Sequence, residues 1–516
     1  MDTPLFHSPS HAEVAAAIAA RAAKRFSHQT DAALADLLAD TVFHERKRLE
    51  HDKAEPDYVA LLDGGARALR DARRSDVEES LLKLVRYYGA EIHNPFSPRA
   101  YKVATQVLPG AMARLLSASS GRRLMTGHFD LGSHFKVDGP LAQIKALIAS
   151  GATIVVAPTH VSNLDSPLIG MGLYQAGLPP CAYGAGLNLF STPAMAFFMR
   201  RLGAYTVDRR KRGRLYKDSL KDYSTETIKR GCHSLFFPGG TRSRSGRVET
   251  QLKKGLLGTG ILAWEERLRE GKKEDVFVVP LTLSIGVVLE AETLVADALA
   301  DEGKQRYIIS DDEFSRPGEV ASFGRRLMQL DCRVHMVFGE PMDVVGNPID
   351  AEGYSLDPHG DRLDRRGYVT DRDGKVVSDE QRDQVYTERV SRRLCDAYQR
   401  GLVVQSTQLA AWAAWTALQA QHPGRDVYHL IRLHPEDRRI AKVEVVRRIG
   451  DAVLRLQGQR RDCPSDPERV LQEALRLFAG FHKRKALEDT AAGIQLSGEL
   501  TWYYHNRLVG LLREGA

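Results

Sequence analysis

The sequence predicts an α/β fold: a twisted, mostly parallel central sheet flanked by helices, with helical N- and C-terminal regions. Two observations favour this fold. Short apolar runs recur between about residues 128 and 345, and helix-length stretches separate them. Because the runs are almost continuously apolar, they are typical of strands covered on both faces, as in a parallel sheet. On both sides of this region, helical periodicity replaces the strand signals.

The predicted strands are four segments rich in β-branched and aromatic residues. They are TIVVAP at 153–158, SLFFP at 234–238, VFVVPLTLSI at 276–285 and RVHMVFG at 333–339. Their alternation with helical stretches is the pattern of βαβ units.

The flanking regions are expected to be helical. Ser10 is a plausible N-cap before the alanine-rich segment HAEVAAAIAARAAKRF. Apolar residues at helical spacing follow at Val77, Leu81, Leu84, Val85 and Tyr88. Gly110 and the cluster Ser117–Gly121 interrupt the pattern.

Four regions follow from these boundaries. They are a helical N-terminal region (1–125), an α/β domain (126–345), an excursion dense in Gly, Asp and Pro (346–380) and a helical C-terminal region (381–516). The excursion is expected to be a long surface loop or a small hairpin. No internal repeat is expected.

Composition indicates in which compartment the protein works and which class of partner it binds. The 516 residues are 43% hydrophobic and 27% charged, with a net charge of +7 and a pI near 9.0. This charge suits phosphates, an acidic membrane or nucleic acid, and serves solubility equally well. Five scattered cysteines predict no disulfide framework or zinc site and fit a reducing cytosol. Without a signal peptide or a spanning apolar stretch, membrane association is expected to be peripheral.

The first chemically informative stretch is APTHVSNLDSPL, residues 157–168. His160 follows a predicted strand, so it is expected at the carboxyl edge of the sheet, where ligands bind. Asp165 is close enough in sequence to orient the imidazole, whose other nitrogen could then accept a proton from a hydroxyl. The alternative is a capping Asp beside an incidental His.

The second stretch is GAYTVDR, which ends at Arg209 and continues into four more basic residues up to Arg214. This basic run could be a solvated face, a nucleic-acid patch or a phosphate clamp. Aromatic interleaving and a recognisable nucleic-acid module are both missing from the sequence, so we expect no nucleic-acid partner.

The third stretch is FFPGGTRSRSGR, residues 236–247. Gly239 and Gly240 allow close approach of the backbone to a ligand, and Arg242 and Arg244 follow. Backbone donors beside arginines suit a phosphate or a developing oxyanion. A glycine turn with solvated basic residues is an equally valid interpretation of this stretch alone.

Taken together, these stretches resemble the four sequence blocks of the glycerolipid acyltransferases, HxxxxD, GxxFIxR, FPEGTRS and VPxxI. The fourth block corresponds to VVPLTL around Pro280. All four occur in order across about residues 125–345. RSRSGR and the later YYHNRL, residues 503–508, are similar to segments of the glycerol-3-phosphate and dihydroxyacetone-phosphate branch.

The resemblance implies a role for each matching residue. His160 matches the general base, Asp165 its orienting acid, and Pro280 a structural position. The phosphate-contacting arginines correspond to Arg209, Arg242 and Arg244. The candidates for backbone stabilisation of the oxyanion are Gly239, Gly240, Thr241 and Ser243.

Two departures accompany the resemblance. Gly239 stands where the third block usually has Glu, so a role of that carboxylate is missing or supplied elsewhere. Thr206 replaces the usual Phe, and Asp208 puts an acid beside Arg209.

The resemblance implies an O-acyltransferase that moves an acyl group from acyl-CoA or acyl-carrier protein to glycerol-3-phosphate. It implies no metal or organic cofactor, and a cytoplasmic protein in peripheral contact with an anionic membrane. Two alternatives stay open, namely a 1-acylglycerol-3-phosphate (lysophospholipid) acceptor and a catalytically silent scaffold that binds anionic lipid. Retention of both His160 and Asp165 weighs against the silent scaffold.

Overall fold

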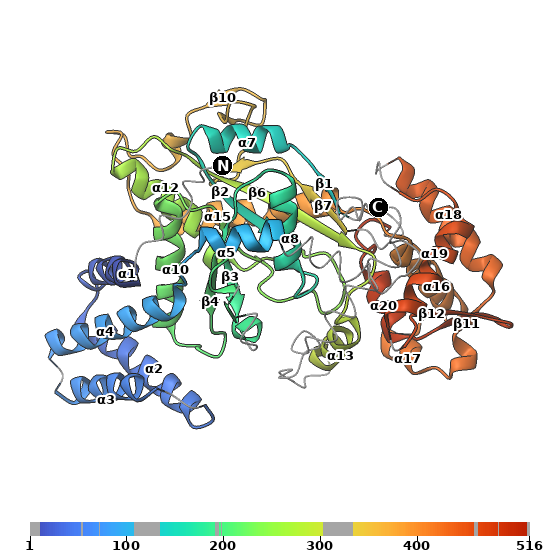
Figure 1. Cartoon of the computed structure of the whole chain (residues 1–516), viewed down its shortest axis with the longest axis horizontal. Helices are drawn as coiled ribbons and strands as arrows, with labels where there is room; N and C mark the ends of the chain where they lie inside the picture. Colours follow the sequence, from blue (N-terminus) through green and yellow to red (C-terminus); the bar gives the residue numbers. More distant parts are fainter. Residues whose placement is uncertain are drawn as a thin grey trace.

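The predicted fold class is confirmed by a computed structural model. It describes residues 11–52, 55–71, 73–107, 135–190, 196–197, 199–302, 334–458, 463–482 and 484–512. Figure 1 shows the N-terminal helices in blue, a central sheet with its covering helices, and a C-terminal helical region in orange and red.

The central sheet has the strand order β1-β7-β6-β2-β5-β3-β4, and β8 pairs with β6. Its strands are β1 (Phe135–Asp138), β2 (Thr153–Pro158), β3 (Ala182–Gly186), β4 (Ala204–Val207), β5 (Ser234–Leu235), β6 (Val276–Ile285), β7 (Val334–Phe338) and β8 (Met342–Asp343). The five strands from β6 to β4 run parallel, whereas β7 and β8 are antiparallel to β6. The carboxyl ends of the five parallel strands therefore meet at one edge.

Alternate residues of β2 face opposite layers of helices. The helices that flank the sheet are α7 (Leu141–Ala149), α8 (Asp165–Gln175), α10 (Arg214–Lys229) and α12 (Thr259–Arg269). Val155 and Ala157 pack in one core with α10 and α12, whereas Ile154 and Val156 pack in the other with α7 and α8. Burial on both faces explains why β2 and β6 are continuously apolar.

Two predicted strands, β2 and β6, have the expected bounds. The strand predicted over 234–238 ends early, because β5 covers only Ser234–Leu235. Pro238 has no amide hydrogen to continue a ladder, and the chain leaves the sheet there as a loop. That loop carries the glycine and arginine residues.

The N-terminal region is helical, as predicted. Its helices are α1 (His11–Phe26), α2 (Asp31–Leu49), α3 (Pro56–Asp71), α4 (Arg74–Ile92) and α5 (Pro98–Lys102), followed by a π-helical turn (Val103–Val107). The five periodic apolar residues of α4 are all buried. Tyr205 of β4 and Tyr216 of α10 belong to the same core, so the bundle docks on the sheet edge. Gly110 and residues 117–121 lie outside the described residues.

The C-terminal region is mainly helical but also contains a small sheet that was not predicted. Its helices are α15 (Glu380–Gly401), α16 (Ser406–Gln421), α17 (Val427–Arg432), α18 (Lys442–Gln457), α19 (Pro467–Phe481) and α20 (Glu499–Asn506). Three short antiparallel strands, β11 (Arg439–Ile440), β12 (Leu487–Thr490) and β13 (Gly493–Leu496), accompany them. At two to four residues each, these strands are too short for a clear alternating pattern. Among the described residues, none of the helices has the length and apolar character to cross a bilayer.

The segment after β8 contains a repeat, which corrects the expectation that the chain has none. The pattern D-x-x-G recurs every seven residues, starting at Asp343, Asp350, Asp357, Asp364 and Asp371. In four of the five copies the Asp amide donates to the carbonyl four residues on, and the Gly has a positive φ of 75–92°. Each of these copies is therefore a tight hairpin turn. The strands β9 (Ser355–Leu356) and β10 (Arg362–Leu363) form one of the hairpins, as expected for this excursion.

Candidate active site

The imidazole of His160 lies just beyond β2, at the carboxyl edge of the sheet, as predicted. Its Nδ1 is 2.9 Å from Oδ2 of Asp165, the first residue of α8. Asp165 is completely buried, and its carboxylate is an acceptor, so Nδ1 carries the hydrogen and Nε2 is the basic nitrogen. The ring stacks on Phe237 with 4.0 Å between centroids. The hydrogen bond to Asp165 and the stacking on Phe237 thus fix the orientation of the imidazole, and the hydrogen bond also fixes its tautomer.

The electrostatic surroundings favour a neutral imidazole. Burial lowers the pKa of His160 below its ordinary value, the hydrogen bond and charge of Asp165 act in the opposite direction, and Arg209 and Arg242 lower it further. A histidine that is neutral near pH 7 can accept a proton, as a general base must.

Carboxylates hold the backbone of residues 160–163, the candidate catalytic loop. The amides of residues 161 and 162 donate to Asp165 Oδ2 at 2.6 and 2.9 Å. The amide of His160 donates to Glu249 Oε1 at 2.7 Å, and that of Asn163 donates to Glu290 Oε1 at 3.0 Å. Four consecutive amides thus end on three acidic side chains, which immobilises the loop that carries the base.

Glu249 was not predicted from the sequence. It follows the loop after β5 that carries Arg242 and Arg244, hereafter the arginine loop. Burial raises the pKa of its carboxyl, the charge of Arg507 acts against that, and the hydrogen bond from His160 does so too. A Cβ added to Gly239 would lie 3.2 Å from Cγ and 3.5 Å from Oε1 of Glu249. Position 239, where the third block usually has Glu, carries no carboxylate. The carboxylate of Glu249 occupies the adjoining space instead.

Glu290 follows β6 and joins the catalytic loop to the arginine loop. Its side chain is completely buried and accepts a hydrogen bond from Ser162 Oγ at 2.8 Å. Arg242 Nη1 lies 3.4 Å from Glu290 Oε1. The first arginine of the third block is therefore positioned by a buried carboxylate.

The three predicted phosphate arginines converge. Arg244 Nε lies 3.9 Å from Asp297 Oδ2, on α13 (Ala291–Glu302). Solvent reaches the Arg209 side chain, yet the surrounding protein lowers the pKa of its guanidinium, and the charges of Arg242 and Arg244 lower it further. Because the charges of Arg242 and Arg244 act on Arg209, the three cations are close in space, and an anion between them would relieve their repulsion.

Arg210 and Lys211, the two residues after Arg209 in the basic run, have a structural role. Arg210 pairs with Asp208 at 2.9 Å and with Asp52 at 3.0 Å. The Lys211 side chain is buried, pairs with Glu91, and places its ammonium 4.9–5.5 Å from the centroids of four tyrosine rings. Arg210 and Lys211 therefore hold the N-terminal bundle against the sheet, whereas Arg209 lies at the site.

Two of the four candidate oxyanion amides are used within the fold. Gly240 N donates to Phe237 O at 2.9 Å, and Ser243 N donates to His160 O at 2.8 Å. The second bond ties the arginine loop directly to the base. Gly239 and Thr241 remain the amides available for the proposal of an oxyanion site.

Pro280 lies within β6, opposite Ala157 of β2. Pairing of β6 with β7 begins at Leu281, and pairing with β8 ends at Val278. Pro280 thus faces the turn between β7 and β8, where its missing amide hydrogen breaks no ladder. The structural role expected for Pro280 stays a prediction.

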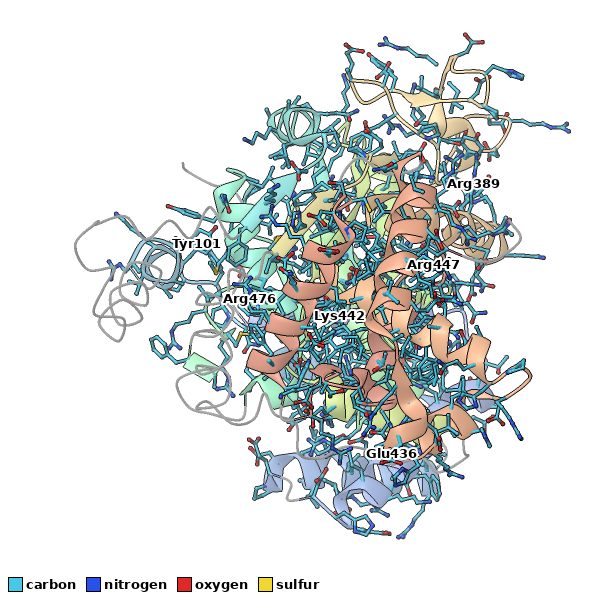
Figure 2. All side chains as sticks on the ribbon, turned by 90° about the vertical axis from the view of Figure 1, so that its right-hand side faces the viewer. Tyr101, Arg389, Glu436, Lys442, Arg447 and Arg476 are labelled. Atoms are coloured by element: carbon cyan, nitrogen blue, oxygen red, sulfur yellow. The ribbon has the colours of Figure 1, made fainter. Side chains whose placement is uncertain are left out.

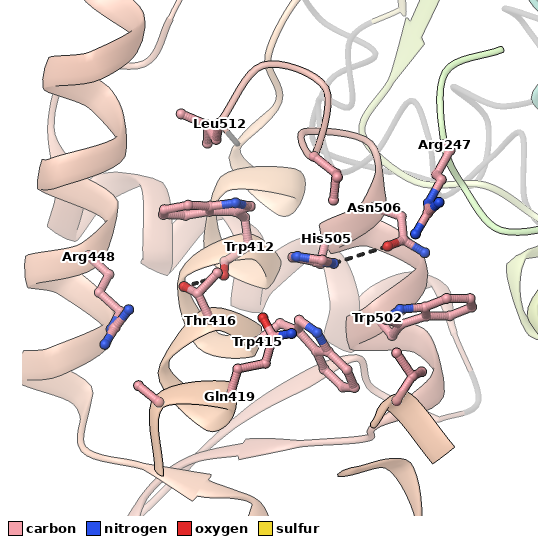
Figure 3. A pocket seen from close by; sticks show the side chains of 13 residues that line it. Arg247, Trp412, Trp415, Thr416, Gln419, Arg448, Trp502, His505, Asn506 and Leu512 are labelled. Atoms are coloured by element: carbon pink, nitrogen blue, oxygen red, sulfur yellow. Dashed lines mark hydrogen bonds between the residues drawn. The ribbon is translucent and has the colours of Figure 1, made fainter. Parts of the chain in front are cut away.

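Helix α20, which belongs to the C-terminal region, packs against the arginine loop. Asn506 Nδ2 donates to Ser245 O at 2.8 Å, and a Cβ on Gly246 would come within 2.2 Å of Tyr503 O. Figure 3 shows Asn506 beside Arg247, at the wall of a cavity of about 620 Å³ that Trp412 and Trp502 also line. His160 does not line this cavity.

Glu249 and Glu290 were not predicted from the sequence, because each meets the His160 loop across a long separation in the chain. Acidic residues just after the glycine-arginine turn and just after the fourth block were the available signals. Among the described residues, no three His, Cys, Asp or Glu side chains are grouped as metal ligands.

The site residues predicted from the sequence, from His160 to Pro280, lie within a segment that matches known proteins. Residues 142–284 match the family model described as Acyltransferase. A glycerol-3-phosphate acyltransferase of Haemophilus ducreyi is 34% identical over 152 residues, 29% of this chain and 18% of that protein. One from Pasteurella multocida is 31% identical over 201 residues, 39% of this chain and 23% of that protein.

The chain thus aligns with about a fifth of the length of these relatives. Among solved structures, the 1-acyl-sn-glycerophosphate acyltransferase of Thermotoga maritima matches with a TM-score of 0.24 and 19% identity. That match covers 57% of this chain and 83% of the other.

Proposed function

Because residues 142–284 are an Acyltransferase-family domain, we propose that this protein transfers a fatty-acyl group from a thioester donor to a hydroxyl of glycerol-3-phosphate. The observation that carries the proposal is the pair His160 and Asp165, 2.9 Å apart, beside three converging arginines. The names of the relatives support the acceptor.

In the proposed reaction, Nε2 of His160 takes the proton of the acceptor hydroxyl as its oxygen attacks the thioester carbonyl. A tetrahedral intermediate forms, and the amides of Gly239 and Thr241 are our candidates to stabilise its oxyanion. The C–S bond then breaks, and the imidazolium returns the proton to the leaving thiolate. Asp165 holds the imidazole and stabilises its charged form throughout.

The acceptor phosphate would lie among Arg209, Arg242 and Arg244. Planar guanidinium groups match phosphate oxygens in geometry as well as charge. Because Ser243 N is bound to His160 O at 2.8 Å, the arginine loop and the base keep a fixed relation. Binding of the phosphate would therefore also determine which hydroxyl meets Nε2.

The test is transfer of one labelled acyl group to a panel of acceptors: glycerol-3-phosphate, 1-acylglycerol-3-phosphate, dihydroxyacetone phosphate and glycerol. Acyl-CoA and acyl-carrier protein serve as alternative donors. We expect the highest kcat/KM with glycerol-3-phosphate, and a fall in kcat of about 100-fold or more in His160→Ala. Equal use of glycerol, or an active His160→Ala enzyme with a normal melting curve, would refute the proposal.

We also propose peripheral contact with an anionic membrane through the outer face of α18. Val443 and Leu454 are 76% and 70% exposed. Lys442 and Arg447 of α18 and Arg476 of α19 lie on the same side of the molecule, as Figure 2 shows. Lys442 and Arg447 also pair with nearby carboxylates, so the two exposed apolar side chains are the main support for contact with the headgroup region.

Sedimentation with anionic and neutral vesicles tests the membrane proposal. Binding to anionic vesicles should weaken at high salt and in Val443→Asp/Leu454→Asp. Equal binding to neutral vesicles, or binding that the double variant leaves intact, would refute this face as the contact.

A further inference from the structure

Tyr503, on α20, has a hydroxyl without a hydrogen-bond partner among the described residues, although the side chain is only 2% exposed. Buried polar groups are nearly always paired, because an unpaired one costs stability. The unpaired hydroxyl of Tyr503 therefore indicates that this residue binds a ligand or has another function.

The surroundings of the hydroxyl are those of the active site. After burial, which raises the pKa of the Tyr503 phenol most, the largest influences on it are the charges of Arg507, Glu290, Arg242 and Asp165. Glu290 and Asp165 hold the backbone of the catalytic loop, and Arg242 is a predicted phosphate ligand. The ring itself lies against the arginine loop, since its Cδ2 would be 3.3 Å from a Cβ on Gly246, and the charges of the groups around His160 act on its hydroxyl.

The position of Tyr503 is fixed by the packing of α20 on the arginine loop. Its carbonyl oxygen would lie 2.2 Å from a Cβ on Gly246, so residue 246 has to be glycine for this approach. Gly246 also has a φ of +79°, which favours glycine. This backbone contact lies three residues before Asn506, whose Nδ2 donates to Ser245 O at 2.8 Å. The two contacts leave the Tyr503 ring little freedom.

We propose that the Tyr503 hydroxyl donates a hydrogen bond to the phosphate of the acceptor held by Arg242. A phenol O–H can rotate toward an anionic oxygen, and such charge-assisted bonds are stronger than neutral ones. The acceptor site is then composite, because Tyr503 lies more than 200 residues beyond the matched segment 142–284. This inference rests on the function proposed above.

The test is Tyr503→Phe in the full chain, which removes one oxygen and keeps the ring. The KM for glycerol-3-phosphate should rise about 10- to 100-fold, as expected for loss of a hydrogen bond to a charged group. The inhibition constant of inorganic phosphate should rise in parallel. The donor KM should stay within about threefold, and the melting temperature should stay equal or increase because no internal bond is lost.

Tyr504→Phe is the matched control. Its hydroxyl accepts from Val288 N at 3.1 Å and lies 2.6 Å from Nε2 of His482. Removal of that hydroxyl should lower the melting temperature, because buried partners lose their bond, and should leave the acceptor KM near normal. The two adjacent tyrosines should therefore show opposite patterns of stability and substrate affinity.

Several outcomes would overturn the assignment. An unchanged acceptor KM and an unchanged phosphate inhibition constant in Tyr503→Phe would mean that the hydroxyl serves no ligand, for example because a buried water pairs it. A fall in kcat alone would place it at the reacting carbonyl instead of the phosphate. If the unaltered enzyme did not prefer phosphorylated acceptors, the proposed function itself would fail, whatever Tyr503→Phe does.

Discussion

The carboxylate of Glu249 occupies the space toward which a side chain at Gly239 would project, since an added Cβ would lie 3.2 Å from Glu249 Cγ. The same carboxylate binds the amide of His160 at 2.7 Å. One acidic side chain from beyond the arginine loop therefore occupies the space beside Gly239 and holds the backbone of His160, the proposed base.

Glu249→Ala should lower kcat by roughly 10- to 100-fold with little change in acceptor KM, because small misplacements of a base have large effects on rate. Glu249→Gln keeps an oxygen for the His160 amide and should retain most of the activity. Steady-state kinetics on variants matched for melting temperature measure both effects. Equal losses in the two variants would show that charge, not the hydrogen bond, matters.

Gly239→Ala extends this test. In the normal background its Cβ should displace Glu249 and reduce kcat, whereas in Glu249→Ala the space is open and the added loss should be small. Neighbours that share space show such non-additivity. Simple addition of the two losses would contradict the steric relation.

The fold and the main site residues could be predicted because they leave local signals. Strands buried on both faces give continuous apolar runs, so β2 and β6 have the predicted bounds. His160 and Asp165 lie five residues apart, within one turn. Glu249 and Glu290 meet this loop from 89 and 127–128 residues away, a relation that periodicity does not encode. The seven-residue repeat beginning at Asp343 escaped detection because each copy is a turn, without an apolar pattern.

The pH dependence follows from the neutral imidazole as the active form. The pKa of His160 is lowered from 6.5, chiefly by burial, so activity should be kept down to a pH below 6.5 and lost only as the pH falls through the lowered pKa. The acidic limb of kcat/KM against pH measures this value. An acidic limb above pH 6.5 would contradict the assignment.

Asp165→Asn removes the charge that raises the pKa of His160. The acidic limb should therefore move to still lower pH, while kcat falls about 100-fold or more because tautomer control and imidazolium stabilisation are lost. Acceptor KM should change little. A pure KM effect would assign Asp165 to substrate binding.

Arg209→Ala is the clearest test of the phosphate site among the arginines. Arg242 also accompanies the buried Glu290 at 3.4 Å, so its removal should destabilise the fold as well, whereas Arg209 is exposed. Loss of one charge-assisted contact, about 1.5–3 kcal/mol, should raise the KM for glycerol-3-phosphate about 10- to 100-fold. Donor KM and slow thioester hydrolysis by water should be preserved. A higher donor KM with a normal acceptor KM would move the arginine to the donor site.

Lys211 tests the structural interpretation of the basic run. Its ammonium lies 4.9–5.5 Å from the ring centroids of Tyr58, Tyr87, Tyr88 and Tyr216, three of them in the N-terminal bundle. Cation–π contacts are strongest when desolvated, and together they should contribute about 2 kcal/mol here.

Lys211→Met keeps the apolar stem but removes the charge and leaves Glu91 without this partner. The bundle should then detach more readily, which limited proteolysis between the bundle and the sheet and urea unfolding would detect. Lys217→Met, an exposed position on α10, is the matched control and should unfold normally. Since the ammonium lies among tyrosine rings and pairs with Glu91, the acceptor KM of Lys211→Met should stay near normal in the enzyme that remains folded. A raised acceptor KM with unchanged stability would instead make Lys211 a phosphate ligand. The claim that Arg209 binds the phosphate while Lys211 only holds the bundle would then be wrong.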